Sequence, residues 1–240
     1  MRYFSIEKPI IENLLKTAID EHYSKIILDD ILFYRTVKFI FNLSVLFQPN
    51  TIEYIVKYVV ETYISRYTEY QDDCLYTIRT MMASANISLY IAERSNMYLA
   101  DKQMLFVAAM FQDLDHTNGS ECDSYNVSRA IIGYRHKVEF GGMFASMVQN
   151  VVDYNTIISD AIFCTVIPTR MKPEFIIEQI LVDSNFLLHL LPDIDKLVYG
   201  MNNESEYQYT KESLSDTFVR QGYYTDIAKK LAADNTILYF

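Results

Sequence analysis

The feature that most constrains the fold is the spacing of apolar residues, which recur every three or four positions along nearly the whole chain. The first such stripe comprises Ile10, Ile11, Leu14, Leu15 and Ile19. This period matches the turn of an α-helix and not the alternation of a β-strand. Only six glycines and five prolines occur in 240 residues, too few for the many tight turns of a sheet-rich fold. The sequence therefore predicts an all-α protein.

The same periodicity, together with capping and turn signals, predicts where the helices lie. Helices are expected at about residues 10–19, 26–41, 52–63, 75–89, 98–111, 125–134, 138–154, 156–167, 173–191, 214–221 and 225–235. The segment 98–111 is apolar around most of its circumference, which predicts a central helix that is buried on most sides. No shift in composition marks a domain boundary. Residues 1–240 are therefore expected to form a single multi-helix domain with a C-terminal helical extension at about 210–240.

Net charge and cysteine usage exclude several classes of protein. The formal net charge is −10, so we expect no broad nucleic-acid surface, although a local basic pocket for a small anion stays open. The three cysteines are scattered, which is typical of a reduced, cytoplasmic protein. The N-terminal residues contain no signal-peptide pattern, and no stretch approaches the roughly 20 apolar residues of a membrane span. No membrane partner is expected.

The most unusual local sequence follows the expected central helix. Residues 107–119 read VAAMFQDLDHTNG, an apolar helix end followed by a polar turn. Residues 123–127 (DSYNV) open the next helix, and residues 180–184 (ILVDS) place an aspartate on a later apolar helix. Together these segments resemble the metal-binding motifs of the HD phosphohydrolase superfamily, most closely its cyclic-nucleotide phosphodiesterase-like branch. The resemblance covers about residues 72–195 and implies an HD-like helical core there.

The resemblance implies a site in which histidine and aspartate side chains hold divalent ions, and a metal-bound water attacks phosphorus. The family pattern is a histidine on an early helix, a His-Asp pair and a distant aspartate. The phosphodiesterase branch adds a general-acid histidine four residues before the first. This chain departs at three of these positions: Tyr76 stands at the general-acid position, Thr80 at the first metal histidine, and Gln112 at the histidine of the pair. The catalytic pattern is therefore incomplete.

Asp113 and Asp183 stand at the two metal-ligand positions that are kept, with His116 beside them as a residual acid or base. Neutral threonine and glutamine oxygens are poor ligands for transition metals, so no tightly bound metal is expected. Two carboxylates leave room for a single, weakly held Mg²⁺ or Mn²⁺. Ordinary alternatives remain open. Asp113 and Asp115 then belong to an acidic loop that caps the next helix, His116 bonds the backbone, and Asp183 is a buried carboxylate satisfied by a neighbouring hydroxyl.

The resemblance also indicates which residues would contact a ligand. These are Arg79, Asp115, Asn118, Gly119 and Asn126. An arginine turned inward would supply the bidentate phosphate contact that metals otherwise make, whereas a surface charge is the ordinary role for Arg79. Tyr76 and Thr80 are either polar filler or contacts to a base or phosphate.

Three functions are compatible with these residues. The leading one is a catalytically degenerate HD-type protein that binds a nucleotide or other phosphate ligand in the former active site. The second is an active, single-ion phosphohydrolase or phosphodiesterase that uses Asp113, Asp183 and His116. The third is a structural or protein-interaction module, whose aromatic content and acidic charge suit a protein partner or a homo-oligomer. A collapsed cavity at Gln112 together with a partner would favour the third.

Overall fold

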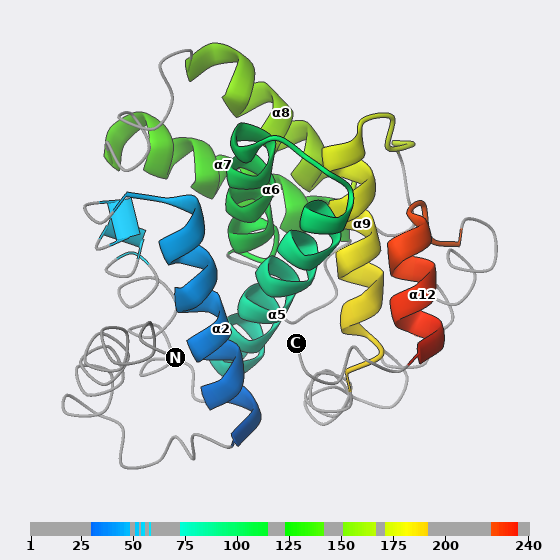
Figure 1. Cartoon of the computed structure of the whole chain (residues 1–240). Helices are drawn as coiled ribbons and strands as arrows, with labels where there is room; N and C mark the ends of the chain where they lie inside the picture. The colour runs from blue at the N-terminus through cyan, green and yellow to red at the C-terminus, as the bar shows by residue number, and fades with distance from the viewer. Residues whose placement is uncertain are drawn as a thin grey trace.

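The computed structural model describes residues 30–48, 51–52, 54–55, 58, 73–114, 123–141, 151–166, 171–191 and 222–234. Within these residues every regular element is a helix, so the predicted all-α class is confirmed (Figure 1). The helices are α2 (Asp30–Leu46), α5 (Asp73–Arg94), α6 (Leu99–Phe111), α7 (Asp123–Gly141), α8 (Val151–Phe163), α9 (Ile176–Leu188) and α12 (Asp226–Asp234). None of these helices is long and apolar enough to cross a membrane.

Helices α5 and α6 form the centre of the molecule. α5 packs against α2, α6, α9 and α12, and α6 packs against α5, α7, α8 and α9 (Figure 1). Every residue of α6 from Met104 to Phe111 is buried, which confirms the predicted central helix. α5 is buried to the same degree from Arg79 to Leu89, although its sequence is more polar. The core therefore lies around two adjacent helices rather than one.

Aromatic side chains of α6 anchor the helices on either side. The ring of Phe106 stacks on Phe39 of α2 with centroids 5.3 Å apart. The ring of Phe111 stacks on Tyr58 at 5.0 Å and meets Tyr134 of α7 edge-on at 5.3 Å. Pairs of this kind contribute about 0.5–1.5 kcal/mol beyond the area that they bury. They place the C-terminal end of α6, which carries the motif, in the interior.

The boundary predicted between helices at residues 154 and 156 is wrong, because α8 runs unbroken through it from Val151 to Phe163. The Asn155 side chain accepts a hydrogen bond from the hydroxyl of Tyr134 at 2.7 Å. The break predicted between residues 134 and 138 is also wrong, since α7 continues to Gly141. In both places polar residues that suggest a turn instead make contacts between α7 and α8. Arg135, for example, donates from Nε to Ser159 Oγ at 3.2 Å.

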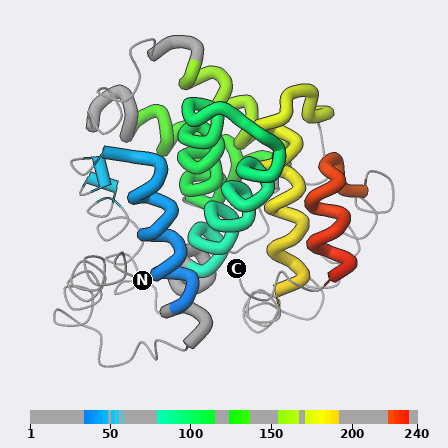
Figure 2. Tube along the Cα trace, viewed as in Figure 1, coloured from blue at the N-terminus to red at the C-terminus, as the bar shows by residue number. Residues whose placement is uncertain are grey.

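Helix α9 begins three residues later than the sequence predicts. The carboxylate of Glu178 folds back and accepts hydrogen bonds from the backbone N–H groups of Glu174, at 2.7 Å, and Phe175, at 3.1 Å. Glu178 is the third residue of the helix, and its bonds to the preceding backbone make one half of a capping box. This contact sets the start of α9 at Ile176. The C-terminal helix lies within one residue of its prediction, and Figure 2 shows it alongside α9. The helices predicted at residues 10–19 and 214–221 lie outside the described residues.

Candidate buried polar site between α5, α6, α9 and α12

Three hydroxyl side chains form a stripe on one face of α5. Thr80, Ser84 and Ser88 are spaced by four residues, and all three are fully buried. Residues four apart on an α-helix lie about 40° apart around its axis, so these side chains share one face. Buried hydroxyls need hydrogen-bond partners because desolvating them is otherwise costly. The partner of Ser84 follows the end of α6, and the partner of Ser88 lies on α9.

Gln112, at the C-terminal end of α6, is joined to this stripe. Its Nε2 donates to Ser84 Oγ at 2.8 Å, and the side chain is 1% exposed. The amide oxygen of Gln112 is also buried and accepts no hydrogen bond from the part of the chain that the structure describes. A buried acceptor left unpaired costs about 1–3 kcal/mol. The glutamine at the family's histidine position is therefore held in the core by a neutral contact.

Ser88 connects the stripe to α9. Its hydroxyl donates to Ser184 Oγ at 2.8 Å, and the Ser184 hydroxyl donates to the carbonyl oxygen of Leu181 at 2.8 Å. The chain of bonds ends on a carbonyl, so each donor has an acceptor. Neutral contacts therefore join α5 to both α6 and α9.

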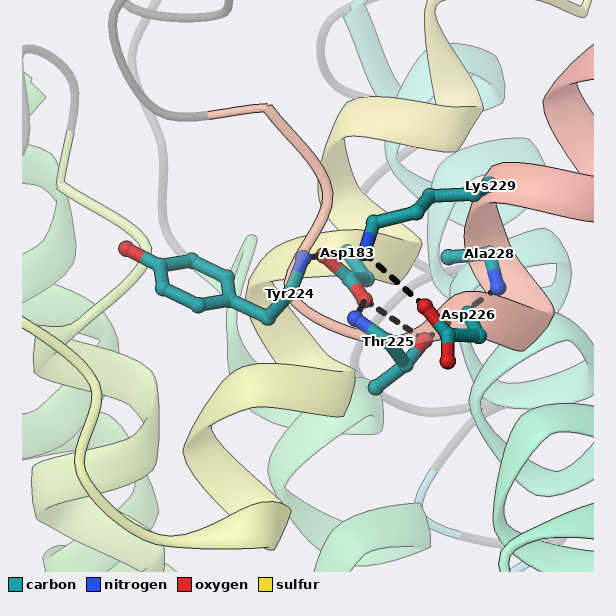
Figure 3. A network of polar contacts seen from close by, with 6 residues as sticks. All are labelled: Asp183, Tyr224, Thr225, Asp226, Ala228 and Lys229. Atoms are coloured by element: carbon teal, nitrogen blue, oxygen red, sulfur yellow. Dashed lines mark hydrogen bonds and ion pairs between the residues drawn. The ribbon is translucent and has the colours of Figure 1, made fainter.

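Asp183, next to Ser184 on α9, holds the start of α12 (Figure 3). Its Oδ1 accepts from the backbone N–H of Tyr224 at 2.7 Å. Its Oδ2 accepts from the backbone N–H and from the hydroxyl of Thr225, both at 2.7 Å. We call Asp183, Tyr224 and Thr225 the Asp183 clamp. The alternative predicted for Asp183, a buried carboxylate satisfied by a neighbouring hydroxyl, is confirmed by this geometry.

The clamp also caps α12. Thr225 Oγ1 accepts a hydrogen bond from the backbone N–H of Ala228 at 3.2 Å, which is the N-cap arrangement. Burial raises the pKa of Asp183, while the three hydrogen bonds and the more distant Lys229 act in the opposite direction without cancelling it. A helix N-terminus favours a negative group, so the aspartate occupies the place that an anion would take there. The Asp183 carboxylate thus attaches the start of α12 to α9, in addition to the apolar packing of Ala228 and Leu231.

The other predicted site residues are divided between different faces. Arg79 is 6% exposed, so the surface position considered for it is wrong. Arg79 lies five residues before Ser84, which places it about 140° around α5 from the hydroxyl stripe. It shares a face of α5 with Met82 and Asn86, which accept hydrogen bonds from Thr36 and Asn42 of α2. Asp113 is partly exposed at the end of α6, and Asn126 is buried on α7.

The remaining predicted residues are not placed. Tyr76 lies in α5, but its side chain is outside the described part of the chain. Asp115, His116, Asn118 and Gly119 also lie outside the described residues. Their predicted roles stay predictions.

Sequence reasoning missed the serines that make the contacts. Ser84, Ser88 and Ser184 bond across helices, and Thr225 caps α12. A signal was present, because hydroxyl residues recur every four positions along α5. Thr225 followed by Asp226 is likewise an ordinary N-cap pattern. The partner of each hydroxyl, however, is far away in sequence.

A second polar cluster joins α8 and α9. Burial raises the pKa of the Cys164 thiol to about 12, and the nearby carboxylates of Glu178 and Asp160 act in the same direction. Burial also raises the pKa of Asp160, with a further contribution from Glu178 that Arg135 opposes. Cys164 is 1% exposed. A buried thiol that stays protonated is a packing residue and not a nucleophile.

The described residues do not fit a tightly bound metal. Within them no three histidine, cysteine or acidic side chains are grouped as metal ligands. Thr80 and Gln112 offer only neutral oxygen atoms, and a metal at Asp183 would compete with three hydrogen bonds. No catalytic step through a metal follows from these residues.

A scan against protein-family models, a search of curated proteins and a search of solved structures each found no match. The resemblance to the HD superfamily therefore stays a prediction.

Proposed function

We propose that this protein is a helical interaction module that binds a second copy of itself through the outer face of α2, and that it acts without a catalytic metal. Of the three functions compatible with the sequence, this is the one that the contacts support best. The support has two parts, the closed interior and one exposed helix face.

The interior supports a role other than hydrolysis. Gln112 and Ser84 bond each other across α5 and α6, and Thr80 is fully buried beside them. Asp183 uses both carboxylate oxygens to hold α12. Within the described residues these polar side chains therefore join helices to one another, a use that stabilises the fold.

The observation that carries the proposal is an apolar stripe on α2. Tyr34, Phe41 and Val45 are 63%, 46% and 52% exposed, although α2 buries its opposite face in the core. Their spacing of seven and four residues places them on one side of the helix. A row of large apolar side chains turned to water is typical of a surface that is covered in an assembly.

A second copy of the chain fits this stripe. Two identical helices can pair about a twofold axis, so that each apolar residue meets its counterpart or a neighbour. No aspartate or glutamate occurs between residues 31 and 52, although the whole chain carries a net charge of −10. Two copies can therefore bring α2 to α2 without placing carboxylates against each other.

Sedimentation equilibrium over a wide range of protein concentration tests the proposal. The wild-type chain is expected to associate, and Phe41→Glu is expected to be monomeric with an unchanged circular-dichroism spectrum. Ile132→Glu is the matched control, because Ile132 is 66% exposed on α7 and distant in sequence from the stripe. A wild-type chain that stays monomeric at every concentration, or association that survives Phe41→Glu, would overturn the proposal.

A second candidate function, binding of a small ligand, is favoured by the unpaired Gln112 oxygen. A hydroxyl or amino group of a nucleotide would satisfy this buried acceptor. Thermal-shift measurements with mono-, di- and cyclic nucleotides test it, with Gln112→Leu as the control. Stabilisation of the wild type that Gln112→Leu abolishes would support this function, and no shift with any nucleotide would reject it.

A further inference from the structure

The outer face of α7 carries a row of basic and apolar side chains. Tyr125 and Ile132 are 51% and 66% exposed, Arg129 between them is partly exposed, and Ser128 and Arg135 are exposed beside them. Tyr125, Arg129 and Ile132 are spaced by four and three residues, so they follow one another along one side of the helix. The buried side of α7 packs against α6 and α8. The row therefore faces away from the core.

The charge of this segment is opposite in sign to that of the whole chain. Residues 124–138 contain no aspartate or glutamate, whereas the chain has 31 such residues and a net charge of −10. Nε of Arg135 donates to Ser159 of α8, and Asp160 is close enough to interact with the charge of Arg135. Cζ of Arg129 is 6.0 Å from the centroid of the Tyr125 ring, and no carboxylate among the described residues forms an ion pair with Arg129. The row thus presents a positive charge between two exposed apolar side chains.

We propose that the outer face of α7 binds an acidic segment of another protein, one in which glutamates or aspartates flank large apolar residues. The carboxylates of the segment pair with Arg129 and Arg135, and its apolar side chains cover Tyr125 and Ile132. Tyrosine and arginine are among the residues that contribute most of the binding energy at protein interfaces. Exposed apolar side chains rimmed by polar ones are typical of such an interaction site.

Charge decides between an acidic partner and a second copy of the chain. Twofold pairing of α7 with α7 would set the arginines of one copy against those of the other, which is unfavourable. An acidic segment is attracted to α7 and repelled by the net negative charge of the chain, so it is directed towards this face. The inference depends on α7 and is independent of the proposed self-association through α2.

Fluorescence anisotropy with a synthetic peptide and the full chain tests the inference. The probe is a labelled, helix-forming peptide of the same length as α7, with leucines along one side and glutamates on both edges of that side. A matched peptide with glutamine in place of every glutamate separates charge from apolar contact. The chain should bind the glutamate peptide severalfold more tightly than the glutamine peptide. High salt should remove most of this difference, because it screens the charges.

Three variants locate the binding surface. Arg129→Gln should weaken binding of the glutamate peptide severalfold, whereas Arg129→Lys retains the charge and should keep most of the affinity. Ile132→Glu should weaken binding by about tenfold or more, because it puts a negative charge at the centre of the contact. Lys172→Gln is the matched control, since it removes one positive charge from an exposed position outside α7 and should bind as the wild type does.

Vesicles of phosphatidylserine and phosphatidylcholine form a separate arm of the experiment. Binding to these vesicles without binding to the glutamate peptide would assign the face to a membrane surface and overturn the inference. The inference is also overturned if the wild-type chain does not bind the peptide at millimolar concentration. The same holds if Arg129→Gln and Ile132→Glu bind the peptide as tightly as the wild type, with unchanged circular-dichroism spectra. Loss of peptide binding in Ile132→Glu with self-association retained would show that the α7 and α2 surfaces act separately.

Discussion

Removing the carboxylate of Asp183 should release α12 from the core. Asp183→Ala takes away the acceptor for the backbone N–H groups of Tyr224 and Thr225 and for the Thr225 hydroxyl. If α12 stayed in place, each stranded buried donor would cost about 1–3 kcal/mol. α12 can avoid the cost of unpaired donors by detaching from the core. The free energy with which α12 docks therefore sets an upper limit on the stability that Asp183→Ala loses.

The docking energy can be worked out from what α12 buries. Its fully buried positions are Ala228 and Leu231. Burial of a leucine side chain contributes about 1.5–3 kcal/mol, and the alanine methyl adds roughly 0.8 kcal/mol. We therefore expect Asp183→Ala to lower the free energy of unfolding by about 2–4 kcal/mol.

Urea denaturation followed by circular dichroism measures this loss, and hydrogen exchange locates it. Amide protection should fall in residues 226–234 and should be retained in α5 and α6. Asp226→Asn is the matched control, because this exposed carboxylate pairs with the exposed Lys229 at 2.9 Å and is expected to matter little. If Asp183→Ala unfolds at the wild-type urea concentration with α12 still protected, the clamp does not hold α12.

The pH dependence of Asp183 gives an independent check on the same carboxylate. Burial raises its pKa in the folded chain above the ordinary value of 3.8. Between 3.8 and the raised value the folded chain binds a proton that the unfolded chain has lost. The contribution of Asp183 to stability should therefore fall as pH rises through this window, and this dependence should be absent from Asp183→Ala.

Three further outcomes are expected. Ser84→Ala should lower the free energy of unfolding by about 1–3 kcal/mol, because it leaves the buried Gln112 amide N–H without an acceptor. The double variant Ser84→Ala, Gln112→Leu should recover most of that loss, and additive losses in urea denaturation would contradict this. Lys38→Met should raise the melting temperature at neutral pH, because burial disfavours the charged form of Lys38 in the folded chain and lowers its pKa to about 8. This gain should fade as pH rises from about 8 to 10.5, and a gain that does not change with pH would contradict the prediction. Cys164 should react with a disulfide reagent at mildly alkaline pH only after the chain unfolds, and rapid labelling of the native protein would show that the thiol is neither buried nor protonated.

The helices themselves could largely be predicted from the sequence, because each depends on apolar spacing within one segment. The buried stretch Met104–Phe111 and the C-terminal helix α12 follow directly from that pattern. The errors lie where polar residues have distant partners. Asn155 suggests a turn by its type, yet its side chain is used by Tyr134, so α8 continues through it.

The candidate site could be predicted only in part. The positions of Thr80, Gln112 and Asp183 on apolar helices indicate that these polar side chains lie inside the protein and need partners. The sequence does not show that Gln112 bonds Ser84. Nor does it show that Asp183 bonds Tyr224 and Thr225, because these pairs are far apart in the chain.

The sequence by itself determined that the described part of the chain is helical, since helix formation depends on interactions within a few residues. Only the tertiary structure decided what the buried polar groups do. A carboxylate has the same chemistry whether it holds a metal or caps a helix, and the groups that reach it decide between these uses. For Asp183 those groups are the backbone N–H groups and the hydroxyl at the start of α12, which packing brings to it from about forty residues away.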